Sequence, residues 1–185
     1  MLLANIKSGS VLVAQPKILG ESFFERSVVL VAKHEKTGSV GFIINKPVHI
    51  HLSDVFAGIN KDFEIFSGGP VDQDKLYFIH NCPDLVPNSI EISNGVYWGG
   101  DFEVVKKLIQ DDVIDTSNVR FFLGYSGWET NQLVSEVSED SWIVKDSIDQ
   151  EIISSKHKDL WRTELRKLGG EFLLWINSPK DPSHN

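Results

Sequence analysis

Residues 27–45 read SVVLVAKHEKTGSVGFIIN, and this segment decides the fold. Two runs dense in β-branched residues, Ser27 to Lys33 and Val40 to Asn45, flank the polar loop 34–39, a spacing typical of a β-hairpin. Both runs are apolar at nearly every position. We therefore expect this hairpin to be covered by other parts of the chain on both of its faces.

Short strands and helices are predicted on either side of this hairpin. We expect further strands at 10–14, 64–66, 76–80, 119–124 and 171–176, and a second hairpin at 90–98. We expect helices at 52–56, 102–110 (capped by Asp101), 129–139 and 151–168, the last ended by Gly169 and Gly170. No repeat or linker separates these elements. The pattern predicts one α+β domain spanning residues 1–185.

Charge and cysteine content indicate a soluble cytoplasmic protein. Eighteen Lys and Arg against 26 Asp and Glu give a net charge of -8, which disfavours direct binding to nucleic acid. The basic segment 156–167 is interrupted by Asp159 and Glu164, as on a solvated helix face. The single Cys82 fits a reducing compartment.

The sequence contains no predicted membrane segment. The longest strongly apolar run, 28–32, is too short to span a bilayer, and residues 1–7 do not resemble a signal peptide. We therefore expect no membrane partner.

The segment Gly124-Tyr125-Ser126-Gly127-Trp128-Glu129 connects a predicted strand to a predicted helix. Ser126 and Glu129 have the spacing of a capping box, in which the hydroxyl would cap the helix. A serine in such a turn is also compatible with an anion site or with a nucleophile elbow, although Trp128 replaces the second glycine of the elbow. The helix cap is the favoured interpretation.

The paired glycines and the paired histidines give weaker indications of a functional site. The sequence Ser67-Gly68-Gly69-Pro70 is typical of a structural turn and is not a phosphate-binding loop. His49 and His51 could form a metal pair if extended, but no third ligand accompanies them, and we predict neither a metal nor a cofactor.

His34 and His80 each end an apolar strand. A half-buried, hydrogen-bonded histidine is the usual occupant of such a position. Either ring could serve as a general base only with a carboxylate partner, which the sequence does not place.

Several short motifs, taken in order, carry a resemblance to a known family. They are Gly9-x-x-Leu12-Val13-Ala14-x-Pro16, Phe24-x-x-Ser27-Val28, His34, Gly41-x-x-x-Asn45-Lys46-Pro47, Gly68-Gly69-Pro70-Val71, Gly124-Tyr125-Ser126-Gly127-Trp128, Gln132-Leu133-x-x-Glu136 and Trp142. With this order and spacing, the chain resembles the AlgH family of bacterial proteins, also called YqgE-like, over about residues 8–170.

The resemblance implies a compact α+β domain whose mainly antiparallel, strongly bent sheet forms a pseudo-barrel flanked by helices. Family members carry the label of transcriptional regulator, and no catalytic residues or cofactor are established for them. The leading interpretation is therefore a non-enzymatic regulatory or adaptor protein whose partner is an unknown protein or small molecule. The alternatives are a hydrolase using Ser126 with His34 or His80 as the base, and a direct DNA binder.

The candidate binding residues are those of the loops at 45–47, 68–70 and 127–128, together with Ser126 and the two histidines that end apolar strands. They are His34, Asn45, Lys46, Pro47, Gly68, Gly69, Pro70, His80, Ser126, Gly127 and Trp128.

Overall fold

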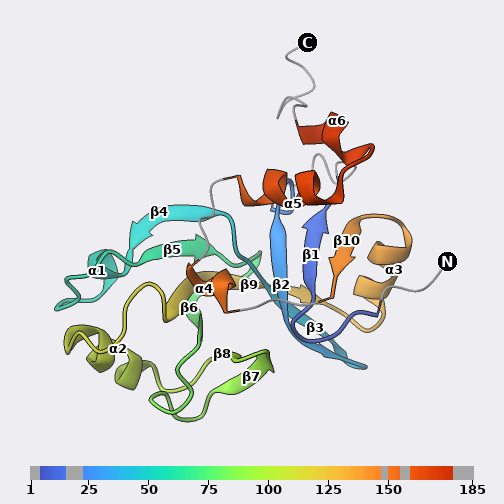
Figure 1. Cartoon of the computed structure of the whole chain (residues 1–185). Coiled ribbons are helices and arrows are strands. Elements are labelled where there is room, and N and C mark those ends of the chain that lie inside the picture. Colours follow the sequence, from blue (N-terminus) through green and yellow to red (C-terminus); the bar gives the residue numbers. More distant parts are fainter. Residues whose placement is uncertain (1–4, 16–22, 147–149, 155–158, 177–185) are drawn as a thin grey trace.

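The structure, a computed structural model, describes residues 5–15, 23–146, 150–154 and 159–176. Pro16, Lys156 and Lys158, which belong to sequence features discussed above, lie outside these ranges. Within them the chain forms ten strands and six helices (Figure 1). The strands are β1 (Val11–Ala14), β2 (Val28–Glu35), β3 (Gly38–Ile43), β4 (Pro47–His51), β5 (Glu64–Ser67), β6 (Val71–His80), β7 (Ile90–Ser93), β8 (Val96–Trp98), β9 (Val119–Trp128) and β10 (Trp142–Lys145). The helices are α1 (Leu52–Val55), α2 (Phe102–Gln110), α3 (Gln132–Ser138), α4 (Glu151–Ser154), α5 (Leu160–Leu168) and α6 (Phe172–Ile176).

The strands form one open, mainly antiparallel sheet. Its order is β10-β1-β2-β3-β9-β6-β8-β7, and β4 joins it through β5, which pairs with β9 in parallel. The expected α+β class and antiparallel sheet are confirmed. The expected barrel is only approximate, because β10 and β7 stand at opposite ends of this order and the described strands do not close a ring.

The hairpin formed by β2 and β3 is buried on both faces, as its sequence predicts. Leu30 and Phe42 belong to one apolar cluster, whereas Val29, Val31 and Ile43 belong to another, and all five side chains are fully buried. Alternate residues of each strand therefore serve two cores. The connecting loop is shorter than expected, because His34–Ser39 and Glu35–Gly38 are already paired across the hairpin.

Helix α2 agrees with its sequence pattern. The Asp101 carboxylate accepts hydrogen bonds from the backbone N–H groups of Glu103 (3.0 Å) and Val104 (3.4 Å), which caps the helix N-terminus. Val105 and Ile109 face the core. Helix α1 also forms where one turn was expected.

The last third of the chain differs from two of its predictions. The expected helix 151–168 is divided into α4 and α5, and α5 ends at Gly169 with a left-handed φ of 68°. The expected final strand 171–176 is the helix α6, in which the N–H of Leu174 bonds the carbonyl of Glu171. A run of five apolar residues has no periodicity that separates a strand from a helical turn, which explains the error.

The N-terminal and C-terminal segments meet at β1. This strand pairs with β2 on one edge and with β10 on the other. Helix α5 lies across the ends of β1 and β2 (Figure 1), and the indole Nε1 of Trp161 donates a 2.8 Å hydrogen bond to the carbonyl of Ala14. The arm formed by β4 and β5 extends away from α5.

Candidate functional site

A cleft of about 990 Å³ contains three of the predicted site residues, Asn45, Lys46 and Pro47. It lies between the β4–β5 arm, the turn before β2 and the beginning of α5. Its lining residues are Glu25, Arg26, Asn45, Lys46, Pro47, His49, His51, Asp62, Glu64, Asp159, Leu160, Trp161 and Arg162. Segments far apart in sequence therefore build this site together.

Asn45 fixes the shape of the cleft floor with both ends of its side chain. Its Oδ1 accepts a 2.8 Å hydrogen bond from the N–H of Val28, and its Nδ2 donates one of 2.9 Å to the carbonyl of Arg26. Arg26 has a left-handed φ of 53°, which is unusual for a residue with a side chain. Asn45 thus holds an uncommon turn against the end of β3.

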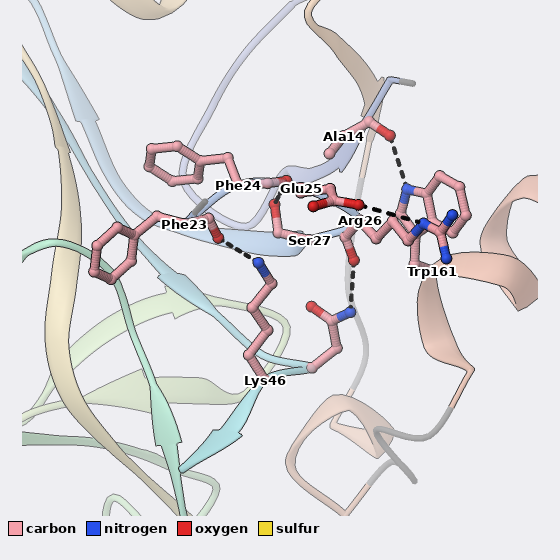
Figure 2. Close-up of polar contacts among 9 residues, drawn as sticks. Ala14, Phe23, Phe24, Glu25, Arg26, Ser27, Lys46 and Trp161 are labelled. Carbon is pink, nitrogen blue, oxygen red and sulfur yellow. Dashed lines mark hydrogen bonds and ion pairs between the residues drawn. The ribbon is translucent and has the colours of Figure 1, made fainter. Parts of the chain in front are cut away.

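That turn places the Arg26 guanidinium over the indole of Trp161 (Figure 2), with 5.4 Å between the guanidinium carbon and the ring centroid. This distance is within the range of a cation–π contact. Glu25 Oε1 lies 3.9 Å from Arg26 Nε, so the turn presents an acid and a base side by side. Trp161 itself is only 4% exposed, so it supports Arg26 and does not offer a free ring face.

Lys46, another residue of the cleft lining, reaches toward the same turn. Its Nζ donates a 2.5 Å hydrogen bond to the carbonyl of Phe23 (Figure 2). This bond holds the ammonium group at a defined position in the cleft lining. Lys46 therefore brings a fixed positive charge to the base of the cleft.

The β4–β5 arm contributes two acidic residues, Asp62 and Glu64, to the cleft lining. The Asp62 carboxylate contacts His51 Nδ1, and Glu64 lies beside the buried Arg120 of β9. Arg120 donates from Nη1 to the carbonyl of Ile44 at 3.0 Å. Burial lowers the pKa of Arg120 to about 10, while the charge of Glu64 acts in the opposite direction, so the guanidinium is charged at neutral pH. A buried cation therefore lies beside Glu64, a residue of the cleft lining.

The beginning of α5 completes the cleft. Asp159 occupies the N-cap position with a left-handed φ of 62°, and its Oδ1 lies 3.2 Å from Arg162 Nη1. Together with Arg26 and Lys46, Arg162 gives the lining three cationic side chains. The four lining carboxylates are those of Glu25, Asp62, Glu64 and Asp159. The cleft thus presents both signs of charge in nearly equal number.

His49 and His51 both line the cleft but do not form a metal centre with other residues. His49 has a left-handed φ of 57°, which interrupts the regular alternation of β4. Within the described ranges, no group of three or more His, Cys, Asp or Glu is arranged to hold a metal ion.

Gly68 and Gly69 meet the segment around Ser126 at a close backbone crossing. A Cβ on Gly69 would lie 2.3 Å from the carbonyl carbon of Tyr125, and one on Gly68 would lie 2.2 Å from the carbonyl oxygen of Gly124. Both positions therefore exclude any side chain. The glycine pair has a packing role, as its turn-like sequence indicates, while Pro70 and Gly127 beside it are exposed.

The helix cap predicted for Ser126 is wrong. Strand β9 continues through Ser126 to Trp128, and α3 begins only at Gln132, after Asn131. Ser126 is fully buried, and its Oγ donates a 3.0 Å hydrogen bond to the carbonyl of Gly68. This burial and backbone bond also contradict the sharp, exposed turn that a nucleophile elbow requires.

The other predicted residues lie apart from the large cleft. His34 Nδ1 is 2.7 Å from Ser39 Oγ, and both residues line a second cleft of about 390 Å³. The indole Nε1 groups of Trp128 and Trp142 both donate to Glu136 Oε2, at 2.9 Å and 2.8 Å. Trp128 is therefore part of the packing between β9, α3 and β10.

His80 is fully buried at the end of β6. Its Nδ1 accepts a 3.3 Å hydrogen bond from the N–H of Cys82, and its ring stacks on that of Tyr97. Burial lowers the pKa of His80, with the backbone of Gly99 acting in the opposite direction. The contacts of His80 do not include Ser126 or His34. These three residues therefore do not form a hydrogen-bonded set.

Sequence reasoning missed Glu25, Arg26 and the start of α5. Arg26 and Trp161 are separated by most of the chain, and each looks like an isolated residue in the sequence. The motif Phe24-x-x-Ser27 encloses Glu25 and Arg26 and is the one local signal that could have directed attention to this turn.

Comparison with known proteins gives a consistent result over nearly the whole chain. A family model described as AlgH-like matches residues 11–173. A UPF0301 protein of Chlorobaculum parvum is 38% identical over 181 residues, covering 97% of this chain and 96% of that protein. A UPF0301 protein of Cytophaga hutchinsonii is 38% identical over 182 residues, covering 97% of this chain and 100% of its own length.

Two solved structures share the fold. A crystal structure of a Corynebacterium diphtheriae protein superposes with a TM-score of 0.77 at 20% identity, covering 96% of this chain and 95% of that one. The solution structure of the AlgH protein from Pseudomonas aeruginosa gives 0.72 at 22% identity, covering 95% and 96%. Among the residues that the structure describes, no helix is long and apolar enough to cross a membrane.

Proposed function

Because this chain belongs to the AlgH-like family of UPF0301 proteins, we propose that it is a non-enzymatic regulatory or adaptor protein of the cytoplasm. In this proposal residues 1–185 act as one domain, and the protein works by binding a partner, a protein or a small molecule, in the large cleft. Its lone cysteine, Cys82, supports a reducing compartment.

The cleft is the observation that carries this proposal. Its volume of about 990 Å³ is ample for a ligand, and its charged side chains are held in place by defined contacts. Asn45 locks the turn of Arg26, Trp161 supports the guanidinium, and Lys46 is fixed by a backbone carbonyl. Such pre-positioned polar groups are typical of a binding site, because less ordering entropy is lost on association.

Charge supports a partner other than nucleic acid. The chain carries a net charge of -8, and Glu25, Asp62, Glu64 and Asp159 line the cleft. These carboxylates would repel a phosphate backbone. We therefore propose that any effect on transcription passes through another molecule. Tight binding of the protein to DNA that weakens steeply as the salt concentration rises would contradict this part of the proposal.

The proposal is tested by transcript profiles in the bacterium that carries the gene. A deletion strain is complemented with the parent protein, with the double variant Asp159→Lys/Arg162→Glu, or with the control Arg166→Glu. Asp159 and Arg162 line the cleft, whereas Arg166 is exposed on the same helix outside it. We expect the deletion to change a defined set of transcripts, the parent and the control to restore them, and the cleft variant to fail.

Equal restoration by the cleft variant, with the protein present at the same level, would contradict a role for the cleft. Turnover of a substrate panel that depends on residues of the cleft would contradict the non-enzymatic assignment.

A further inference from the structure

The charges of the cleft are arranged as neighbouring opposite pairs. Glu25 lies next to Arg26 on the turn before β2, with 3.9 Å between Oε1 and Nε. Asp159 and Arg162 are 3.2 Å apart at the beginning of α5. Each of these two segments of the cleft lining therefore carries an acidic and a basic group side by side.

These pairs are open to exchange with a ligand. The side chains of Asp159 and Arg162 are 62% and 38% exposed, and Asp62, elsewhere in the cleft lining, is 85% exposed beside His51. Exposed ion pairs contribute little to stability because water screens them, so a competing charge can replace a partner at small cost. Glu25 and Arg26 are more buried, at 28% and 12%, so they need a matched charge when a ligand removes water.

We propose that the cleft binds a peptide segment carrying both acidic and basic side chains, an inference that rests on the proposed function. A ligand of one sign would attract either the cationic set (Arg26, Arg162 and Lys46) or the carboxylates, but would place like charges against the other set. A peptide of alternating charge can pair with both sets at once. Complementary potentials of this kind determine which partner is selected.

The size and construction of the cleft favour a peptide over a small zwitterion. Its volume of about 990 Å³ lies at the upper end of the range for small-molecule sites. Its charges come from several separate segments of the chain: the β4–β5 arm, Lys46, the turn before β2 and the beginning of α5. A single amino acid has too few charges to engage the charged groups of all these segments.

Fluorescence anisotropy with three labelled peptides of equal length tests this inference. In one peptide lysine and glutamate alternate, separated by glycine; in the others every charged position is glutamate or every one is lysine. We expect the alternating peptide to bind about fivefold or more tightly than either uniform peptide, because each mismatched charge loses an ion pair. Arg162→Gln and Glu25→Gln should each weaken its binding about threefold to fivefold. The matched control Arg166→Gln should bind like the parent, and melting curves confirm that each variant is folded.

Three other outcomes of this experiment would each contradict one part of the inference. Tighter binding of the all-glutamate peptide that depends on Arg162 overturns the mixed-charge preference and leaves the cleft as the proposed binding site. Absence of binding by all three peptides overturns the peptide assignment, while the transcript experiment separately decides the proposed function. If the alternating peptide binds with equal affinity to Arg162→Gln, Glu25→Gln and Arg166→Gln, the peptide site does not lie in the cleft.

Discussion

Removal of the Asn45 side chain should damage both the fold and the cleft. Asn45→Ala deletes the acceptor of the Val28 N–H and the donor to the Arg26 carbonyl. Each such bond contributes about 0.5–1.5 kcal/mol, and a buried group left without its partner adds about 1–3 kcal/mol. Val28 is only 1% exposed, so water does not easily replace the lost acceptor. We expect the free energy of unfolding to fall by about 2–4 kcal/mol in total.

For a chain of this length, that loss corresponds to a melting temperature lower by about 4–16 °C. Urea titration and thermal melting at one pH measure the two quantities. Asn81→Ala is the matched control, because the half-buried Asn81 also uses both ends of its amide, but toward the exposed Ser117 and the half-buried Asn118, where water can replace the lost bonds. We expect it to lose less than about 1 kcal/mol. Equal melting of Asn45→Ala and Asn81→Ala would refute the role assigned to Asn45.

Three further predictions follow from buried groups. Arg120→Met should lower the free energy of unfolding in urea by about 3–5 kcal/mol, because Glu64 loses its buried counter-charge; a change below about 1 kcal/mol would contradict this. Burial lowers the pKa of His80 below its ordinary 6.5, so the unfolded chain binds the proton more readily. Stability should therefore be complete above about pH 6.5 and decline as the pH falls below it, and urea midpoints of His80→Gln should decline less steeply over the same interval. Ser126→Asp should melt far below Ser126→Ala, since it places a charge against the carbonyl of Gly68 in the core; a helix cap requires the opposite order.

The sequence predicts those elements whose apolar pattern is long and locally bounded. The hairpin of β2 and β3 and the helix α2 with its Asp101 cap are of this kind. Strand β4 is not visible in the sequence, because Pro47 begins it and the left-handed His49 breaks its alternation. Tertiary pairing forms such strands, and local propensity does not reveal them.

The residues of the candidate site are likewise predictable only where a local motif marks them. Asn45, Lys46 and Pro47 are found from their motif, but the partners Arg26 and Trp161 come together only in three dimensions. The capping pattern of Ser126 and Glu129 gives a wrong prediction because residues with this spacing also occur in strands. Pairing of β9 with β3 keeps that segment extended through Trp128, and this long-range interaction overrides the local signal.

The position of β1 between β2 and β10 has a consequence for the order of folding during synthesis. Val11–Ala14 can pair with β2 as soon as the hairpin segment has emerged from the ribosome, but its second edge receives β10 only after residues 142–145 have been made. Trp161, which bonds Ala14, arrives later still. Contacts between such distant segments close large loops and form slowly. The nascent chain therefore carries an unpaired, apolar strand edge through most of its translation, and chaperones that shield such edges would act on it in that interval.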